Sequence, residues 1–208
     1  MRHYLDRLQE SMIAKWNTEA LSDYRGEDFT FANFATEIAR IHTIFNVLDV
    51  KRGDKVALAA KNCSRWAMAF LATTTHRAVA VPILCDFTPE AITNLTAHSD
   101  SFVLFTEPKI WDEMEVEKMP QLRIAINVEN YSILYLKDEE KRSEIETKLA
   151  DIPAVYPEEM RHKVFATSEF HCKIAFVLCN ILNLIFSRFL NIRFAEINLR
   201  YSYIDCVS

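Results

Sequence analysis

Glycine is the residue that this 208-residue sequence has least of. It contains two, Gly26 and Gly53, where average usage of roughly 7% would give about 14 to 15. The 155 residues that follow Gly53 contain none. Walker-type phosphate loops, dinucleotide-binding fingerprints and glycine-rich kinase loops each need several glycines close together, because backbone N–H groups approach a phosphate at φ values that a Cβ forbids. The sequence therefore excludes all three kinds of loop.

The sequence lacks any Cys-x-x-Cys pair. Its five cysteines are scattered: Cys63, Cys85, Cys172, Cys179 and Cys206. Their odd number and irregular spacing argue against a disulfide framework or a zinc site and favour a reducing compartment. Charged residues such as Arg2, Asp6 and Glu10 interrupt the apolar residues at the N-terminus, so no signal peptide is expected. We expect a cytoplasmic protein, with peripheral contact to a membrane left open.

Positive charge is not in excess either. The net charge is −5 and the isoelectric point is near 5.7, which argues against a nucleic-acid-binding surface. Half of the residues are hydrophobic and a quarter are charged, the proportions of a chain that folds. The length suits one domain, or one domain and a piece of another.

Apolar periodicity predicts that strands alternate with helices through the first 151 residues. Helices are expected over 3–16, 34–48, 65–75, 88–98 and 138–151. Strands are expected over 20–24, 29–31, 55–60, 78–83, 101–105, 122–128 and 132–136, with those at 55–60 and 78–83 of the buried type. Apolar strands separated by helices indicate βαβ units, so the predicted fold class is α/β, with a parallel sheet covered by helices on both faces.

Two of the predicted helices have contrasting patterns. The helix over 34–48 can be capped by Thr30 or Asn33. Its apolar stripe follows at helical spacing: Phe34, Ile38, Ile41, Phe45 and Leu48. The helix over 138–151 is dominated by charge and is expected to present a solvated face. Its expected ion pairs, at i,i+4 spacing, are Asp138–Arg142 and Glu144–Lys148.

The composition changes near residue 164. Residues 165–208 hold six Phe, six Ile and five Leu but no Gly or Pro, and their net charge is +1 against −6 for residues 1–164. The most apolar stretch, 174–187, is shorter than the roughly 18 to 20 residues that a membrane span needs. Polar residues at 180, 183, 187 and 191 would form one stripe of a helix. Residues 174–194 are therefore either an interfacial helix with weak membrane-surface contact or the product of biased composition.

Two groups of residues carry types that are found in active sites. His98, Ser99 and Asp100 are adjacent, but a catalytic triad is assembled in space rather than from neighbours, so this segment is interpreted as a helix end. The second group has spacings that match no common zinc pattern; it consists of His162, His171, Cys172 and Cys179. Neither group is assigned a catalytic or metal-binding role.

The remaining candidates are interpreted as structural. His42 and His76 lie in predicted helices as packing or surface residues, and Cys63 and Cys85 lie at strand ends, where buried free thiols are common. Packing against the sheet is expected for Trp66, Met68, Phe70 and Leu71. We therefore assign no catalytic, cofactor-binding or metal-binding residue.

Three short segments stand out from this pattern; they are Phe29-Thr30-Phe31-Ala32-Asn33-Phe34, Gly53-Asp54-Lys55-Val56-Ala57 and Ala78-Val79-Ala80-Val81-Pro82-Ile83. In this order and at these spacings, the sequence resembles the N-terminal region of AMP-forming long-chain fatty-acid–CoA ligases, which are adenylate-forming acyl-CoA synthetases. The resemblance covers roughly residues 3–160 and implies an incomplete N-terminal subdomain of the adenylate-forming fold. It also implies activation of a fatty acid with ATP and Mg²⁺ to an acyl-adenylate, then transfer of the acyl group to coenzyme A.

The sequence departs from this family at defined places. Asn33 stands where the family usually has Glu, which we expect to weaken a capping box into a plain cap. Arg77 and Ala60 stand where the family usually has Gly, and both are expected to be turn positions. In the family, a Ser/Thr/Gly-rich phosphate-binding loop, an adenine-binding segment, a hinge and a C-terminal domain with a catalytic lysine follow the matched region. These have no counterpart here, and nothing after about residue 164 resembles the family.

Together, the resemblance and its departures predict two units: a partial ligase subdomain over 1–160 and a non-homologous hydrophobic tail over 161–208. We expect a ligase that is truncated before its phosphate-binding loop, inactive alone and holding no cofactor itself. The alternative is a non-catalytic interaction or membrane-associated module that uses the tail. A subdomain separated from the segments that follow it is also expected to expose apolar surface.

Overall fold

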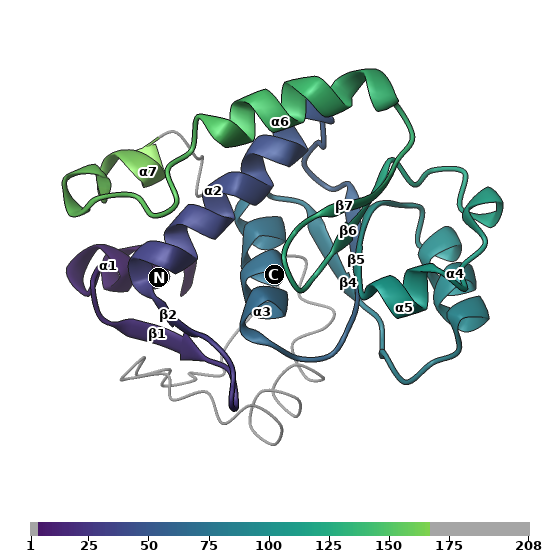
Figure 1. The fold of residues 1–208 in the computed structure, drawn as a ribbon, viewed down its shortest axis with the longest axis horizontal. Helices are drawn as coiled ribbons and strands as arrows, with labels where there is room; N and C mark the ends of the chain where they lie inside the picture. The colour runs from purple at the N-terminus through teal and green to yellow at the C-terminus, as the bar shows by residue number, and fades with distance from the viewer. Residues whose placement is uncertain (1–3, 167–208) are drawn as a thin grey trace, which may run out of the picture.

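The structure, a computed structural model, describes residues 4–166. A five-stranded sheet of order β4-β3-β5-β6-β7 forms the centre, and a small separate sheet pairs β1 with β2 (Figure 1). The strands are β1 (Glu19–Ser22), β2 (Asp28–Thr30), β3 (Lys55–Ala59), β4 (Val79–Pro82), β5 (Ser101–Thr106), β6 (Ile124–Asn127) and β7 (Ile133–Leu136). Each lies within or next to a segment for which the sequence predicts a strand.

Four of the five central strands run parallel. Val56 of β3 pairs with Ala80 of β4 on one side and with Val103 of β5 on the other, and Leu104 of β5 pairs with Ala125 of β6. β7 is antiparallel to β6, because a short turn joins these two strands whereas parallel neighbours need a longer crossover. The predicted α/β class with a parallel sheet is confirmed, with β7 as an antiparallel edge strand.

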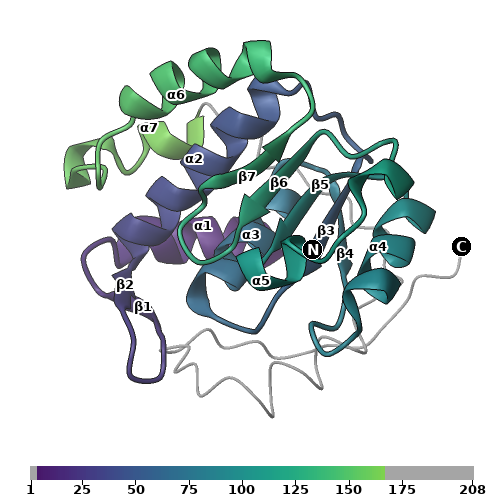
Figure 2. The same cartoon turned by 45° about the vertical axis from the view of Figure 1, so that its right-hand side comes forward.

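Helices cover both faces of the sheet, as predicted (Figure 2). They are α1 (Tyr4–Ala14), α2 (Phe31–Val47), α3 (Ser64–Thr75), α4 (Pro89–His98), α5 (Pro108–Trp111), α6 (Arg142–Ala150) and α7 (Lys163–Ala166), with 3-10 turns η1 (Val116–Lys118), η2 (Glu139–Lys141) and η3 (Glu158–Met160). Successive strand residues point to opposite faces. Phe105 accordingly joins the core under α2, α3 and α6, and Leu104 joins the core under α4 and α5.

The start of α2 corrects one expectation. The Asn33 N–H donates to Thr30 Oγ1 at 3.2 Å, and the Thr30 N–H donates to Asn33 Oδ1 at 2.9 Å, so both halves of a capping box are present. The expectation that Asn33 leaves only a plain cap is wrong, because its amide oxygen reaches the backbone of Thr30. The predicted apolar stripe is confirmed, since all five of its members are buried: Phe34, Ile38, Ile41, Phe45 and Leu48.

Residues 152–158 pass over α1 and α2 and connect them. The Tyr156 N–H donates to Thr36 Oγ1 at 3.0 Å, and the Tyr156 carbonyl accepts from Trp16 Nε1 at 3.2 Å. Arg40 donates to the carbonyl of Pro153 at 3.1 Å. Residues 152–156 belong to no helix or strand. Side chains of Trp16, Thr36 and Arg40 therefore supply hydrogen bonds to backbone groups there.

Strand β4 is not the buried strand that its composition predicts. It lies at the edge of the sheet, and Val79 is 42% exposed. Val79 and Ile83 donate their N–H groups to β3 and the residue that precedes it, so Pro82, one residue from Ile83, faces the open edge. Proline has no N–H to offer another strand, which makes it suited to an edge. An apolar run of this length fits an edge or a central strand, and the order of strands decides between them.

The charged helix is only partly as predicted. Lys148 and Glu144 form the expected ion pair at 2.7 Å, but Arg142 pairs with Glu139 at 2.6 Å and not with Asp138. The reason is that η2 occupies 139–141 and α6 begins at Arg142, which removes the i,i+4 geometry from Asp138. Ile145 on the inner face of α6 is fully buried, so this helix also contributes to the core.

Turns that would suit glycine are formed here by other residues. Gly53 has φ +88°, and five further residues of the described chain hold positive φ: Arg25, Asp49, Arg77, Asp100 and Tyr131. Of the two positions where the resembled family has Gly, Arg77 is left-handed at +66°, as expected for a turn. Ala60 lies in a bend directly after β3, but it is buried and has no positive φ, so this bend does not need glycine.

Within residues 4–166, no helix is long and apolar enough to span a membrane. The tail predicted over 161–208 lies outside the described residues from 167 onward, and the segment 174–194 with it.

Candidate functional site

The topology of the sheet marks one edge as the place for a ligand. β3 continues into α3 on one face of the sheet, whereas its neighbour β5 continues into α5 on the other face. In open α/β sheets, ligands bind outside the carboxyl ends of two strands whose connections diverge in this way. We therefore take the carboxyl ends of β3 and β5 as the candidate site.

Internal hydrogen bonds close the crevice between β3 and β5. Glu107, directly after β5, accepts the Lys61 N–H on Oε1 at 2.9 Å, and Thr106 Oγ1 donates to the Ala59 carbonyl at 2.9 Å. The Glu107 carboxylate is thus committed to a backbone amide of the facing loop.

Both cysteines of the described chain lie near this edge and are free and half-buried. Burial raises the pKa of the Cys85 thiol, and the charges of Asp86 and Glu107 raise it further. Burial likewise raises the pKa of Cys63. The interpretation of both residues as free thiols is confirmed, but they are partly and not fully buried. A thiol must ionise to act as a nucleophile, so the raised pKa values disfavour that role.

The N-terminus of α3, which follows β3, already holds an internal carboxylate. Asp23 in the β1–β2 turn accepts the Ser64 N–H at 2.7 Å and the Ser64 hydroxyl at 2.8 Å, both on Oδ1. Cys63 caps the same helix, its sulfur accepting the Trp66 N–H at 3.4 Å. Helix N-termini attract anions because their N–H groups lack partners. Here the Asp23 carboxylate is the anion at this N-terminus.

A charged cluster beside α3 carries no signal in the sequence. Arg65 pairs with Glu27 at 2.7 Å and lies over the ring of Phe29, 5.0 Å from its centroid. Tyr131, from the β6–β7 turn, donates its hydroxyl to the Arg65 carbonyl at 2.6 Å, and burial raises its pKa well above the usual value. Burial also raises the pKa of Glu37. The cluster joins α2, α3 and the β1–β2 hairpin.

The two lone histidines are brought together. The rings of His42 and His76 are 5.2 Å apart between centroids, and Nε2 of His42 lies 2.9 Å from the Ala72 carbonyl. Burial, followed by the charge of His76, lowers the pKa of His42 to about 4, and burial lowers the pKa of His76. Packing, one of the two roles predicted for them, is confirmed for His42, which is buried.

The structure also places the other residues that the sequence analysis singled out. Ser99 ends α4 and Asp100 has φ +53° directly after it, so the helix-end interpretation of His98-Ser99-Asp100 is confirmed. Trp66 and Met68 are buried, and Phe70 stacks on Trp66 at 5.7 Å. Of the group His162, His171, Cys172 and Cys179, to which no metal-binding role was assigned, His162 alone lies within the described residues. Residues 4–166 hold no group of three or more metal-ligating side chains.

Comparison with known proteins settles the family. The sequence model of one family, described as AMP-binding enzyme, matches residues 8–166. This chain belongs to the AMP-binding enzyme family. The matched region spans almost the whole of the described fold.

Individual relatives match more distantly. Over 87 residues, this chain is 24% identical to the acyl-CoA ligase sidI of Aspergillus fumigatus, and the match covers 42% of this chain and 15% of that protein. The fold of this chain is similar to the anthranilate CoA ligase AuaEII in complex with anthranoyl-AMP, with a TM-score of 0.59, 18% identity, and coverage of 74% of this chain and 29% of that one.

A further solved structure is similar over much the same region. The N-terminal domain of FACL13 from Mycobacterium tuberculosis has a TM-score of 0.57 and 17% identity, and the match covers 76% of this chain and 37% of that one. The chain thus spans well under half of each of these relatives. The solved structures support the fold, and the family follows from the match over 8–166.

Proposed function

We propose that this chain provides the N-terminal part of an acyl-CoA ligase that activates a long-chain fatty acid. The match of the AMP-binding enzyme family to residues 8–166 carries the proposal. In such a ligase, the carboxylate and ATP form an acyl-adenylate with release of pyrophosphate, and the acyl group then passes to the thiol of coenzyme A with release of AMP. The long-chain substrate class rests on the three segments around Thr30, Gly53 and Val81.

The described residues suit a scaffolding role in this reaction better than a chemical one. Adenylyl transfer needs donors and a metal arranged around the phosphates. At the carboxyl edge, Glu107 and Asp23 hold backbone amides of neighbouring loops, and the 155 residues after Gly53 contain no glycine for a phosphate loop. We therefore propose that the 208 residues alone do not form acyl-adenylate.

A chimera tests the positive half of the proposal. Residues 1–160 would replace the matching N-terminal segment of a characterised long-chain ligase, and acyl-CoA formation would be followed with acids of two to eighteen carbons. Retained activity with long acids is expected. A folded chimera that is active with short or aromatic acids alone would contradict the substrate class.

The purified 208-residue chain tests the negative half. Fatty-acid-dependent exchange of pyrophosphate into ATP, with Mg²⁺ present, reports adenylate formation directly. We expect no exchange above that of a sample without acid. Acid-dependent exchange would show that the chain carries a phosphate-binding arrangement outside the described residues.

A further inference from the structure

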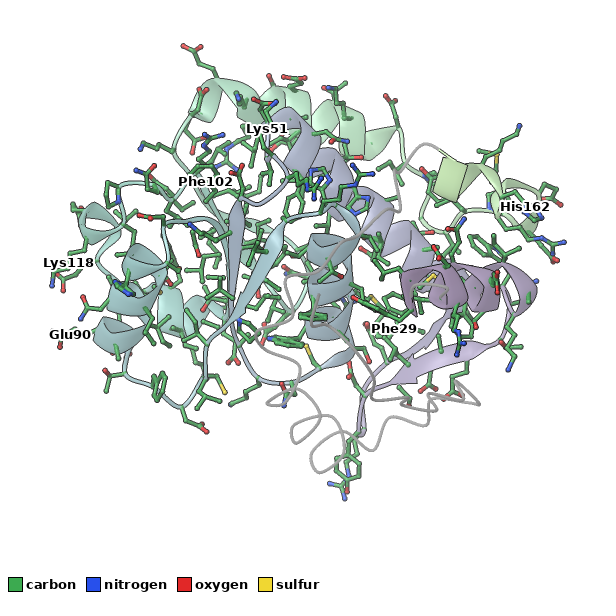
Figure 3. The ribbon with its side chains drawn as sticks, turned by 180° about the vertical axis from the view of Figure 1, so that it is seen from behind. Phe29, Lys51, Glu90, Phe102, Lys118 and His162 are labelled. Atoms are coloured by element: carbon green, nitrogen blue, oxygen red, sulfur yellow. The ribbon has the colours of Figure 1, made fainter. Side chains whose placement is uncertain are left out.

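We draw no further inference here: the strongest candidate, the exposed apolar patch that Val79, Leu84, Phe87 and Leu95 form on β4, on α4 with its Glu90 (Figure 3) and on the loop between them, carries none, because nothing in the part of the chain that the structure describes shows what covers it.

Discussion

The N–H of Gly53 donates to the carbonyl of Arg77 at 2.9 Å, and both residues hold left-handed backbone, with φ of +88° and +66°. The two turns that precede β3 and β4 are therefore fastened to each other. A glycine occupies one of them without strain, whereas an L-residue with a side chain occupies the other at an energetic cost.

We expect Arg77→Gly to be more stable than Arg77→Ala by about 1 kcal/mol. Both variants lose the contacts of the arginine side chain, but only the glycine variant also removes the Cβ from a left-handed residue. Urea unfolding of the two variants measures the difference. Ala60→Gly is the control, because Ala60 is buried and has no positive φ; it should be destabilised by about 0.5–1 kcal/mol. Equal stabilities at position 77 would contradict the strain.

The capping box predicts the effects of changes at position 33. Asn33→Glu should leave stability within about 0.5 kcal/mol of the parent, because either side chain accepts the Thr30 N–H. Asn33→Ala leaves that N–H without its partner and should cost about 1 kcal/mol. Thermal unfolding followed by circular dichroism distinguishes the two. A loss in the glutamate variant as large as in the alanine variant would mean that the Thr30 N–H bond contributes little.

The buried His42 should make the fold sensitive to acid. Its pKa is lowered from 6.5 to about 4, so the folded state binds its proton less readily than the unfolded state. Its neutral form therefore contributes stability that is fully present above pH 6.5 and is lost as the pH falls towards 4. The loss amounts to about 3 kcal/mol at the lower end.

Urea unfolding between pH 8 and pH 4 tests this dependence. His42→Gln should lower stability at neutral pH and flatten the decline between pH 6.5 and 4, because glutamine does not titrate. His98→Gln, at an exposed position on the last turn of α4, should leave the decline as it is. A decline of unchanged steepness in His42→Gln would assign the acid sensitivity to other groups.

The contact between Asp23 and Ser64 predicts a graded series. Asp23→Ala removes the acceptor of two hydrogen bonds at the start of α3 and should cost about 1–2 kcal/mol. Asp23→Asn keeps an acceptor oxygen and should cost less, and Ser64→Ala loses the hydroxyl contact alone. Denaturant midpoints rank the three. If Asp23→Asn were as destabilised as Asp23→Ala, the negative charge at the helix N-terminus and not the hydrogen bond would be the main contribution.

Local signals predicted most of the secondary structure. Thr88, Pro89 and Glu90 place the start of α4, and the stripe from Phe34 to Leu48 places α2, because caps and periodicity depend on residues within two or three turns of each other. The same locality explains the failure at Asp138. A 3-10 turn over Glu139–Lys141 replaces the first turn of the predicted α-helix, so Asp138 no longer faces Arg142. Helix propensity does not distinguish a 3-10 turn from an α-helical turn.

The candidate site was less accessible to such reasoning. Asp23 and Ser64 are 41 residues apart, and Tyr131 and Arg65 are 66 apart. None of these residues belongs to a motif, so no spacing signals their contact. The three segments did predict the broader AMP-binding enzyme family, since their order along the chain is itself a long-range feature; the long-chain fatty-acid class stays a prediction.

The sequence by itself determined the alternation of strands and helices, the residues that fill the core and the family to which the chain belongs. Tertiary structure alone decided that β4 is an edge strand, that Arg77 and not Ala60 needs a left-handed turn, and that His42 meets His76. The physical reason is that hydrophobic periodicity records which side of an element is buried. What that side is buried against follows from the order of strands and the packing of helices, which are set by the whole chain at once.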